Sequence, residues 1–183
     1  MKRRLFLTGP MGCGKSTAIA AALGNRLHDC GGFLTRRYRE PWLHFALETP
    51  DGSSRKTFLQ FPDGKPAADL SVFSGISLDA EVLILDEIGG IELLDPDFAT
   101  KLDTALTGDA PILGVLKGEG PAGALIGTLG LSEEYGIAAA RLRRRLKSDP
   151  DTLVYECGQY DENALLLAKQ WAEEYLHGGK ERL

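Results

Sequence analysis

A glycine-rich segment near the N-terminus has the residue types and the spacing that bind phosphate. It reads Gly9-Pro10-Met11-Gly12-Cys13-Gly14-Lys15-Ser16 and fits the pattern GxxxxGK[ST] at every fixed position. Glycines let successive backbone N–H groups point at phosphate oxygens, and a helix that begins at Lys15 adds the positive end of its dipole. We expect Lys15 to reach the β- and γ-phosphates of a nucleotide, the Ser16 hydroxyl to bind Mg²⁺, and Thr17 to donate to the α-phosphate.

An acidic pair follows an apolar run in the middle of the chain. The run Val82-Leu83-Ile84-Leu85 has the profile of a strand buried on both faces, and Asp86-Glu87 comes directly after it. A phosphate-binding loop needs an acid that holds the water shell of Mg²⁺, and Asp86 is the candidate. A carboxylate one residue further on can polarise an attacking water, so Glu87 is the candidate catalytic base beside Lys15. A small-molecule kinase would suppress such a base, so the pair favours hydrolysis.

The elements that must position these residues alternate along the chain. We expect buried strands at 82–85 and 111–116, a short apolar strand at 4–8 and a last strand at 152–156. Helices are expected at 15–27, 95–108, 132–147 and 161–177, and three short strands at 32–39, 43–49 and 57–61. Segments 63–75 and 118–130 are rich in glycine and proline and are expected to be loops. The pattern predicts an α/β fold with a mostly parallel sheet, helices on both faces, and an antiparallel hairpin excursion over 32–61.

Composition narrows the class of protein further. The 183 residues suit a single domain over 1–183, and the 21 basic against 26 acidic residues give a net charge of −5, which argues against nucleic acid as a partner. No apolar run is long enough for a membrane span, and three scattered cysteines fit a reducing compartment. We therefore expect a cytoplasmic protein without a membrane partner, and the sequence identifies no protein partner.

Two further segments resemble one known family. Gly32-Phe33-Leu34-Thr35 followed by Arg39-Glu40 resembles the GFxT…RE segment of the THEP-type nucleoside triphosphatases, and residues 86–93 resemble their DEIGKMEL segment. The resemblance implies a RecA-like P-loop fold and slow, Mg²⁺-dependent hydrolysis of several nucleoside triphosphates, such as ATP and GTP, to diphosphate and phosphate. Gly90 stands in place of the family's lysine, and Ala164 in place of an arginine near its C-terminus.

Three cations remain as candidate contacts to the γ-phosphate. Lys117 directly follows the strand expected at 111–116, a position where such enzymes often have a polar sensor of the γ-phosphate. The alternative is an exposed loop lysine without such a role. Arg141 and Arg145 lie along one edge of the helix predicted over 132–147. Either could act as an arginine finger in place of the arginine missing at Ala164, or both could simply be solvated cations that offset the helix dipole.

Two other functions stay open on the sequence alone. A nucleotide or small-molecule kinase would use the same phosphate-binding loop with a bound hydroxyl in place of water. A nucleotide-dependent switch protein would use slow hydrolysis to reset an interaction with a partner. The short segments between the motifs leave little room for the lid that a kinase needs, so hydrolysis is the favoured prediction.

Overall fold

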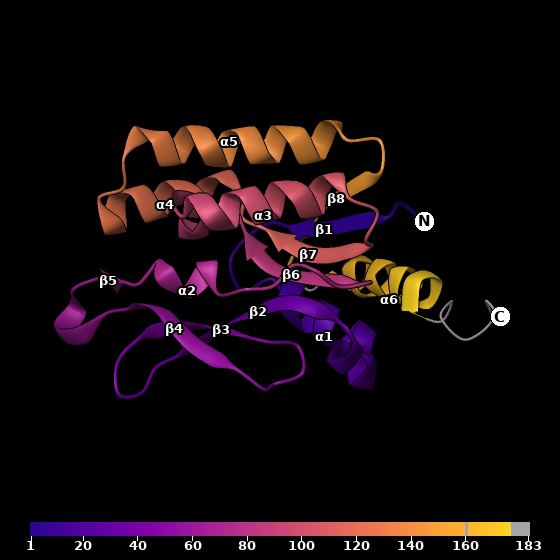
Figure 1. Ribbon diagram of the computed structural model, residues 1–183, viewed down its shortest axis with the longest axis horizontal. Coiled ribbons are helices and arrows are strands. Elements are labelled where there is room, and N and C mark those ends of the chain that lie inside the picture. The colour runs from indigo at the N-terminus through magenta and orange to yellow at the C-terminus, as the bar shows by residue number, and fades with distance from the viewer. Residues whose placement is uncertain (160, 177–183) are drawn as a thin grey trace.

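One sheet of eight strands organises the molecule. A computed structural model of the chain describes residues 1–159 and 161–176 (Figure 1). The strands lie in the order β5-β4-β3-β2-β6-β7-β1-β8. Their bounds are β1 Arg4–Thr8, β2 Gly31–Tyr38, β3 His44–Glu48, β4 Arg55–Gln60, β5 Ala67–Ala68, β6 Leu83–Ile88, β7 Ile112–Leu116 and β8 Thr152–Glu156. The helices are α1 Lys15–Leu23, α2 Ser71–Ser74, α3 Pro96–Thr107, α4 Glu119–Leu129, α5 Glu133–Ser148 and α6 Glu162–Leu176.

Five neighbouring strands, in the spatial order β2-β6-β7-β1-β8, form the parallel part of the sheet. Every pairing among β2, β6, β7, β1 and β8 is parallel, and every residue of β1 and of β7 is buried. Strands covered on both faces need continuous apolar runs, which these segments have. Because parallel strands end at the same edge, the chain leaves β1, β6 and β7 on one side of the sheet. The phosphate-binding loop and the acidic pair both lie at that edge.

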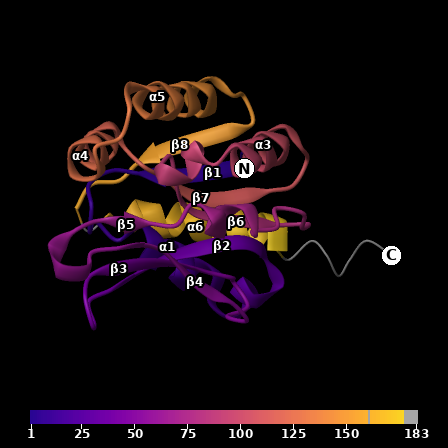
Figure 2. The ribbon, with the colours of Figure 1, turned by 60° about the vertical axis from the view of Figure 1, so that its left-hand side comes forward.

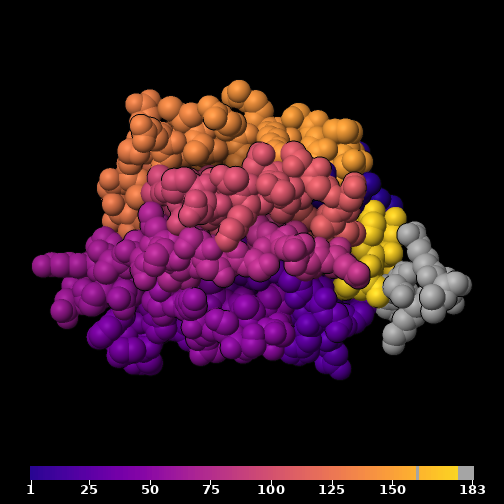
Figure 3. All heavy atoms as spheres, viewed as in Figure 1, coloured from indigo at the N-terminus to yellow at the C-terminus, as the bar shows by residue number. Residues whose placement is uncertain are grey.

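The remaining strands extend the sheet in the antiparallel sense. β2 pairs with β3, β3 with β4, and β4 with the two-residue β5, all antiparallel. The predicted α/β fold with a mostly parallel sheet and an antiparallel excursion is therefore confirmed. Figure 3 shows this excursion on the opposite side of the molecule from α5, with residues of the α2–α3 region between them.

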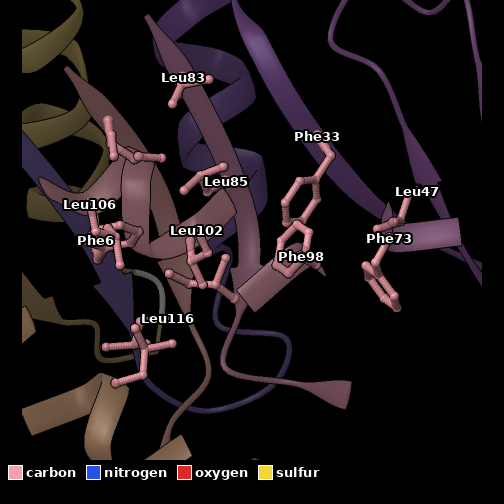
Figure 4. Packing of buried hydrophobic residues seen from close by; sticks show 14 of the residues in the cluster. Phe6, Phe33, Leu47, Phe73, Leu83, Leu85, Phe98, Leu102, Leu106 and Leu116 are labelled. Carbon is pink, nitrogen blue, oxygen red and sulfur yellow. The ribbon is translucent and has the colours of Figure 1, made fainter. Parts of the chain in front are cut away.

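Helices cover both faces of the parallel part (Figures 1 and 2). α3 and α5 pack on one face, where Phe6, Leu85, Leu102 and Leu106 meet in one hydrophobic cluster (Figure 4). α1 and α6 pack together on the other face, whose cluster includes the fully buried Trp171. Asp95 accepts a hydrogen bond from the Phe98 N–H at 2.7 Å, and Pro96 occupies the first turn, so α3 begins as the sequence predicts.

Two segments that the sequence predicts to be loops contain regular structure. Residues 118–130 hold α4, and residues 63–75 hold most of a 3₁₀ turn, β5 and α2. Glycines lower the helix propensity of α4, but its Ala122 packs with Tyr135 of α5, and tertiary packing overrides propensity. The helix predicted over 15–27 becomes 3₁₀ after Leu23. The predicted end of the last helix, at residues 177–179, lies outside the described residues.

No helix in the described ranges combines the length and the apolar character that crossing a membrane requires.

Candidate active site

The phosphate-binding loop joins β1 to α1. Gly9 has a φ of 134°, and a Cβ atom at this position would lie 2.5 Å from the carbonyl oxygen of Cys157, so only glycine fits. Lys15 folds back over the loop, where its Nζ donates to the carbonyl oxygens of Gly9 at 3.0 Å and Pro10 at 2.6 Å. α1 begins at Lys15, so the first N–H groups of this helix lack partners within the helix and are available to phosphate.

A hydrogen bond connects this loop to the acidic pair. The Ser16 hydroxyl donates to Oδ1 of Asp86 at 2.8 Å, although 70 residues separate the two in the chain. Thr35 of β2 holds Asp86 from the other side, since its backbone N–H donates to Oδ2 at 3.4 Å and its hydroxyl donates to the Asp86 carbonyl oxygen at 2.7 Å. Asp86 is only 1% exposed, and this burial raises the pKa of its carboxyl to about 6, against the opposing hydrogen bond from Ser16.

The donors at this point suit Mg²⁺. Ser16 and Asp86 present only oxygen atoms, which are the ligands of a hard cation. A cation here would also favour the ionised form of the Asp86 carboxyl, which burial disfavours. Within residues 1–159 and 161–176, no cluster of three or more His, Cys, Asp or Glu side chains could hold a metal. Mg²⁺ commonly takes one or two protein oxygens and completes its shell with phosphate and water.

Glu87 adopts an unusual backbone conformation at the end of β6. Its φ is 77°, in the left-handed region that non-glycine residues rarely occupy. Its Oε1 lies 2.7 Å from Nζ of Lys117, which follows β7. Strain of this kind is kept where the surroundings demand it and is concentrated at functional sites. The ion pair holds the Glu87 carboxylate at the edge of the phosphate-binding loop.

A cavity of about 310 Å³ lies over the loop. Its lining includes much of the predicted nucleotide site, namely Met11, Gly12, Gly14, Lys15, Ser16 and Thr17, together with Glu87. The structure therefore brings the glycine-rich loop and the candidate base into one space. This arrangement can bind a triphosphate, hold a cation on its phosphates, and set a carboxylate beside the terminal phosphate.

Comparison with known proteins gives two curated relatives and one solved structure. No family model matches the sequence. Nucleoside-triphosphatase THEP1 of Methanocaldococcus jannaschii is 29% identical over 131 residues, which cover 62% of this chain and 77% of that protein. Nucleoside-triphosphatase THEP1 of Thermotoga petrophila is 29% identical over 129 residues, which cover 62% of this chain and 72% of that protein. The chain is similar in sequence to the THEP1 nucleoside-triphosphatases.

The fold agrees with this relationship. The crystal structure of THEP1 from Aquifex aeolicus superposes with a TM-score of 0.63 over 94% of this chain and 98% of that chain, at 16% identity. At that identity the likeness concerns the fold alone. The resemblance to the THEP family that the two sequence segments indicate is thus confirmed.

The candidate arginine fingers of α5 lie beside α3. Arg145 forms an ion pair with Asp103 of α3, and Arg141 lines a shallow cavity between α3 and α5. Among the described residues, neither has a hydrogen bond or ion pair to the phosphate-binding loop. Lys117, by contrast, reaches the site through Glu87. The finger role stays a prediction, and the structure offers it no contact.

Glu92 holds the backbone that follows the acidic pair, and the sequence alone assigned no role to it. Its side chain is 3% exposed, and Oε1 accepts hydrogen bonds from the backbone N–H groups of Gly89 at 2.5 Å and Gly90 at 2.8 Å. The Tyr135 hydroxyl donates to the Gly89 carbonyl oxygen at 3.0 Å. Burial raises the pKa of the Glu92 carboxyl to about 7. Glu92 matches the THEP segment, and that match was the only signal in the sequence.

The side chains of Glu92 and Lys117 leave little space beside Gly90. A Cβ atom there would lie 2.7 Å from Oε2 of Glu92 and 3.3 Å from Cε of Lys117. The space beside this glycine is therefore already filled by Lys117. In this chain, the cation next to the acidic segment is Lys117, which follows β7, and residue 90 supplies none.

Proposed function

We propose that the protein hydrolyses nucleoside triphosphates, ATP and GTP among them, to diphosphate and phosphate in a slow, Mg²⁺-dependent reaction. The observation that carries this proposal is the 2.8 Å hydrogen bond between Ser16 and Asp86, with Glu87 as the next residue. It unites a phosphate-binding loop, a cation site and a carboxylate base in one place. The names of the two curated relatives support the same activity.

The phosphate-binding loop supplies the charge that the reaction needs. Lys15 presently donates to two loop carbonyl groups, and its ammonium group is close enough to the loop to turn to the β- and γ-phosphates. The backbone N–H groups of the loop and of the first turn of α1 bind phosphate oxygens. Together these groups stabilise negative charge that moves toward the bridging oxygen as the terminal P–O bond breaks.

Ser16 and Asp86 hold Mg²⁺ in this proposal. When bound, the ion neutralises charge on the β- and γ-phosphates and fixes their orientation. Thr35 keeps the Asp86 carboxylate in place through both its N–H and its hydroxyl. The Mg²⁺ requirement is supported by the oxygen-only donors and by the burial of Asp86.

Glu87 takes the proton from the attacking water. Its carboxylate lines the cavity that holds the phosphate-binding loop. Lys117 acts as a positioning residue, because its ion pair with Glu87 holds the carboxylate in a fixed direction. Because its ammonium group has three N–H donors, Lys117 could also contact the γ-phosphate as a sensor.

The test is phosphate release by the purified protein. We expect release from ATP, GTP, CTP and UTP that requires Mg²⁺ and stops on addition of EDTA. Lys15→Ala is the control for a contaminating phosphatase, since the variant loses its own activity and keeps any contaminant. Turnover of Lys15→Ala at the wild-type rate would refute the proposed site.

We place this activity in the cytoplasm. All three cysteines are in the described part of the chain and are free thiols, which fits a reducing compartment.

A further inference from the structure

A second cavity adjoins the nucleotide cavity on the side of the antiparallel strands. Its volume is about 260 Å³. The two cavities share a row of lining residues, namely Met11, Thr35, Arg37, Phe45 and Glu87. The second cavity is therefore continuous with the proposed site of phosphate chemistry. Figure 4 shows three of its lining residues, Phe33, Leu47 and Phe73, on the hairpin side of β6.

The lining of this second cavity is largely apolar and includes several aromatic rings. Five of the seven phenylalanines in the chain contribute to it, namely Phe33, Phe45, Phe58, Phe61 and Phe73. The ring of Phe45 lies 6.4 Å from that of Phe58 and 6.5 Å from that of Phe61, and all three side chains are only half-buried. Aromatic surface left partly open to water is stabilised when an apolar ligand covers it.

One end of the cavity is polar. Glu87 and Lys117 line it there, next to the buried carboxyl of Glu92. A pocket with an apolar body and a few polar groups at one end is typical of a site for a small organic molecule. The ligand that complements this pocket has an apolar ring and a polar group that faces Glu87.

The position of the cavity relative to a bound nucleotide follows from the motif. Thr17, which is expected at the α-phosphate, lines the nucleotide cavity but not the second cavity. Glu87 lines both cavities, and its carboxylate belongs beside the γ-phosphate. The second cavity therefore opens at the γ-phosphate end of the triphosphate, away from the α-phosphate end to which the nucleoside is attached. A hydroxyl held there faces the phosphorus atom that water attacks during hydrolysis.

We propose that this aromatic cavity binds a small aromatic alcohol and that the protein transfers the γ-phosphoryl group of a nucleoside triphosphate to its hydroxyl. The alcohol oxygen forms a bond to the γ-phosphorus as the bond between that phosphorus and the β–γ bridging oxygen breaks. The diphosphate leaves with the electron pair of that bond, and the hydroxyl proton passes to the Glu87 carboxylate. The products are a phosphate monoester and a nucleoside diphosphate. The inference rests on the proposed triphosphate site, and hydrolysis is the reaction of water in the open cavity.

The volume sets the size of the alcohol. A cavity of roughly 150 Å³ accommodates benzene. The present cavity, at about 260 Å³, suits one or two rings with a short hydroxylated arm. Benzyl alcohol, phenethyl alcohol and naphthalenemethanol are probes of this class, and glycerol is the polar control.

The test follows both products in one reaction. The protein is incubated with ATP, Mg²⁺ and each alcohol, and phosphorus NMR separates the phosphate monoester from inorganic phosphate. We expect monoester with the aromatic alcohols and inorganic phosphate alone with glycerol. Binding is measured separately by titrating naphthalenemethanol into the Lys15→Ala protein, which does not depend on turnover.

A matched pair of variants on α4 tests the location. Ala124 is exposed on α4 and lines the cavity, whereas Ile126 is exposed on the same helix and does not line it. Ala124→Trp should lower the ratio of monoester to inorganic phosphate by at least about tenfold, while Ile126→Trp should leave that ratio unchanged. Thr128→Trp, at another exposed lining position, repeats the test if Ala124→Trp fails to fold.

Three outcomes would overturn the inference. One is release of inorganic phosphate without monoester when naphthalenemethanol saturates the protein, which leaves hydrolysis intact and rejects transfer. Another is the absence of any binding of naphthalenemethanol at millimolar concentration. The third is equal loss of monoester in Ala124→Trp and Ile126→Trp. If the proposed triphosphatase activity is absent, reactions without alcohol release no inorganic phosphate. That result distinguishes its failure from all three outcomes.

Discussion

The central parallel strands and the outer antiparallel strands of the sheet differ in how far they are buried. All residues of β1 and β7 are buried, whereas β4 in the antiparallel part has a single buried residue, Leu59. The glycine-rich loop follows β1 and Asp86 lies in β6, and both of these strands belong to the parallel part, which has a hydrophobic cluster on each face. The antiparallel strands present half-buried aromatic rings to a cavity. In the proposals above, the phosphate chemistry belongs to the more buried strands and the second ligand to the less buried strands.

The largest difference in unfolding free energy is expected when one glycine in each part is replaced by alanine. Gly32 of β2 has a φ of 91°, and a Cβ atom there would lie 2.1 Å from the carbonyl oxygen of Ile84. Gly32→Ala should cost ~3 kcal/mol or more of unfolding free energy, because backbone atoms cannot move aside. Gly52, in the turn after β3, has a φ of 73° and nothing within 4 Å of such an atom.

Gly52→Ala is therefore the matched control and should cost only about 1 kcal/mol, from backbone strain alone. Urea denaturation of both variants measures the difference. Equal losses would show that the two parts are equally constrained and would remove the contrast.

The next effect concerns the cation at the edge of the parallel part. Asp86→Asn removes the negative charge that Ser16 and Thr35 hold in place. We expect the Mg²⁺ concentration for half-maximal activity to rise by about 10- to 100-fold, with slower turnover at saturation. A titration of phosphate release against Mg²⁺ measures this. An unchanged Mg²⁺ requirement would contradict the assignment of Asp86 as a ligand.

A pH-dependent effect is expected from Glu92. Folding raises the pKa of this carboxyl from 4.5 to about 7, so between these values the folded protein keeps a proton that the unfolded chain has released. The contribution of Glu92 to stability is complete below the lower value and is lost as the pH rises to the upper one. Glu92→Gln should weaken this pH dependence, because its amide oxygen still accepts from Gly89 and Gly90 and cannot ionise.

Urea denaturation at about pH 5 and about pH 8 compares the two proteins. Glu92→Ala is the control, since it removes the acceptor and should destabilise the protein at both pH values by about 1–3 kcal/mol. A Glu92→Gln protein whose stability falls with pH as steeply as the wild type would assign the effect to another group.

The smallest effect is expected at the arginines of α5. Arg145 pairs with Asp103, and both side chains are substantially exposed. Arg145→Ala should change stability by less than about 1 kcal/mol, and kcat should stay within about threefold. The same holds for Arg141→Ala, which serves as the comparison on the same helix. A loss of ~10³ in kcat without a change in Tm would establish an arginine finger and a closing motion of α5.

The contrast between the two parts also explains what could be predicted from the sequence. The strands at 4–8 and 152–156 match the structure residue for residue, because each is a short apolar segment between clear turn residues. The glycine-rich loop and Asp86-Glu87 could be predicted as a site because the function proposed for them requires contiguous residues in a fixed order. The parallel topology then places them at one edge of the sheet.

The remaining features depend on contacts between distant residues. The ion pair of Glu87 with Lys117 joins the ends of two strands, and the aromatic cavity gathers residues from β2, β3, β4, α2 and α4. No local pattern marks such positions. α4 was predicted to be a loop because three of its residues, Gly120, Gly123 and Gly127, are poor helix formers, and its packing against α5 was not visible in the sequence.

The central claim is that Glu87 is the base for attack on the γ-phosphate, and Glu87→Gln tests it most directly. The amide keeps the size and geometry of the side chain but cannot take a proton. Single-turnover hydrolysis of ATP and calorimetric binding of a non-hydrolysable ATP analogue are measured on the wild type, on Glu87→Gln and on Glu81→Gln, an exposed control just before β6. The account predicts a loss of ~10²-fold or more in rate for Glu87→Gln alone, with nucleotide affinity unchanged. Wild-type rates in Glu87→Gln, or loss of binding together with rate, would contradict it.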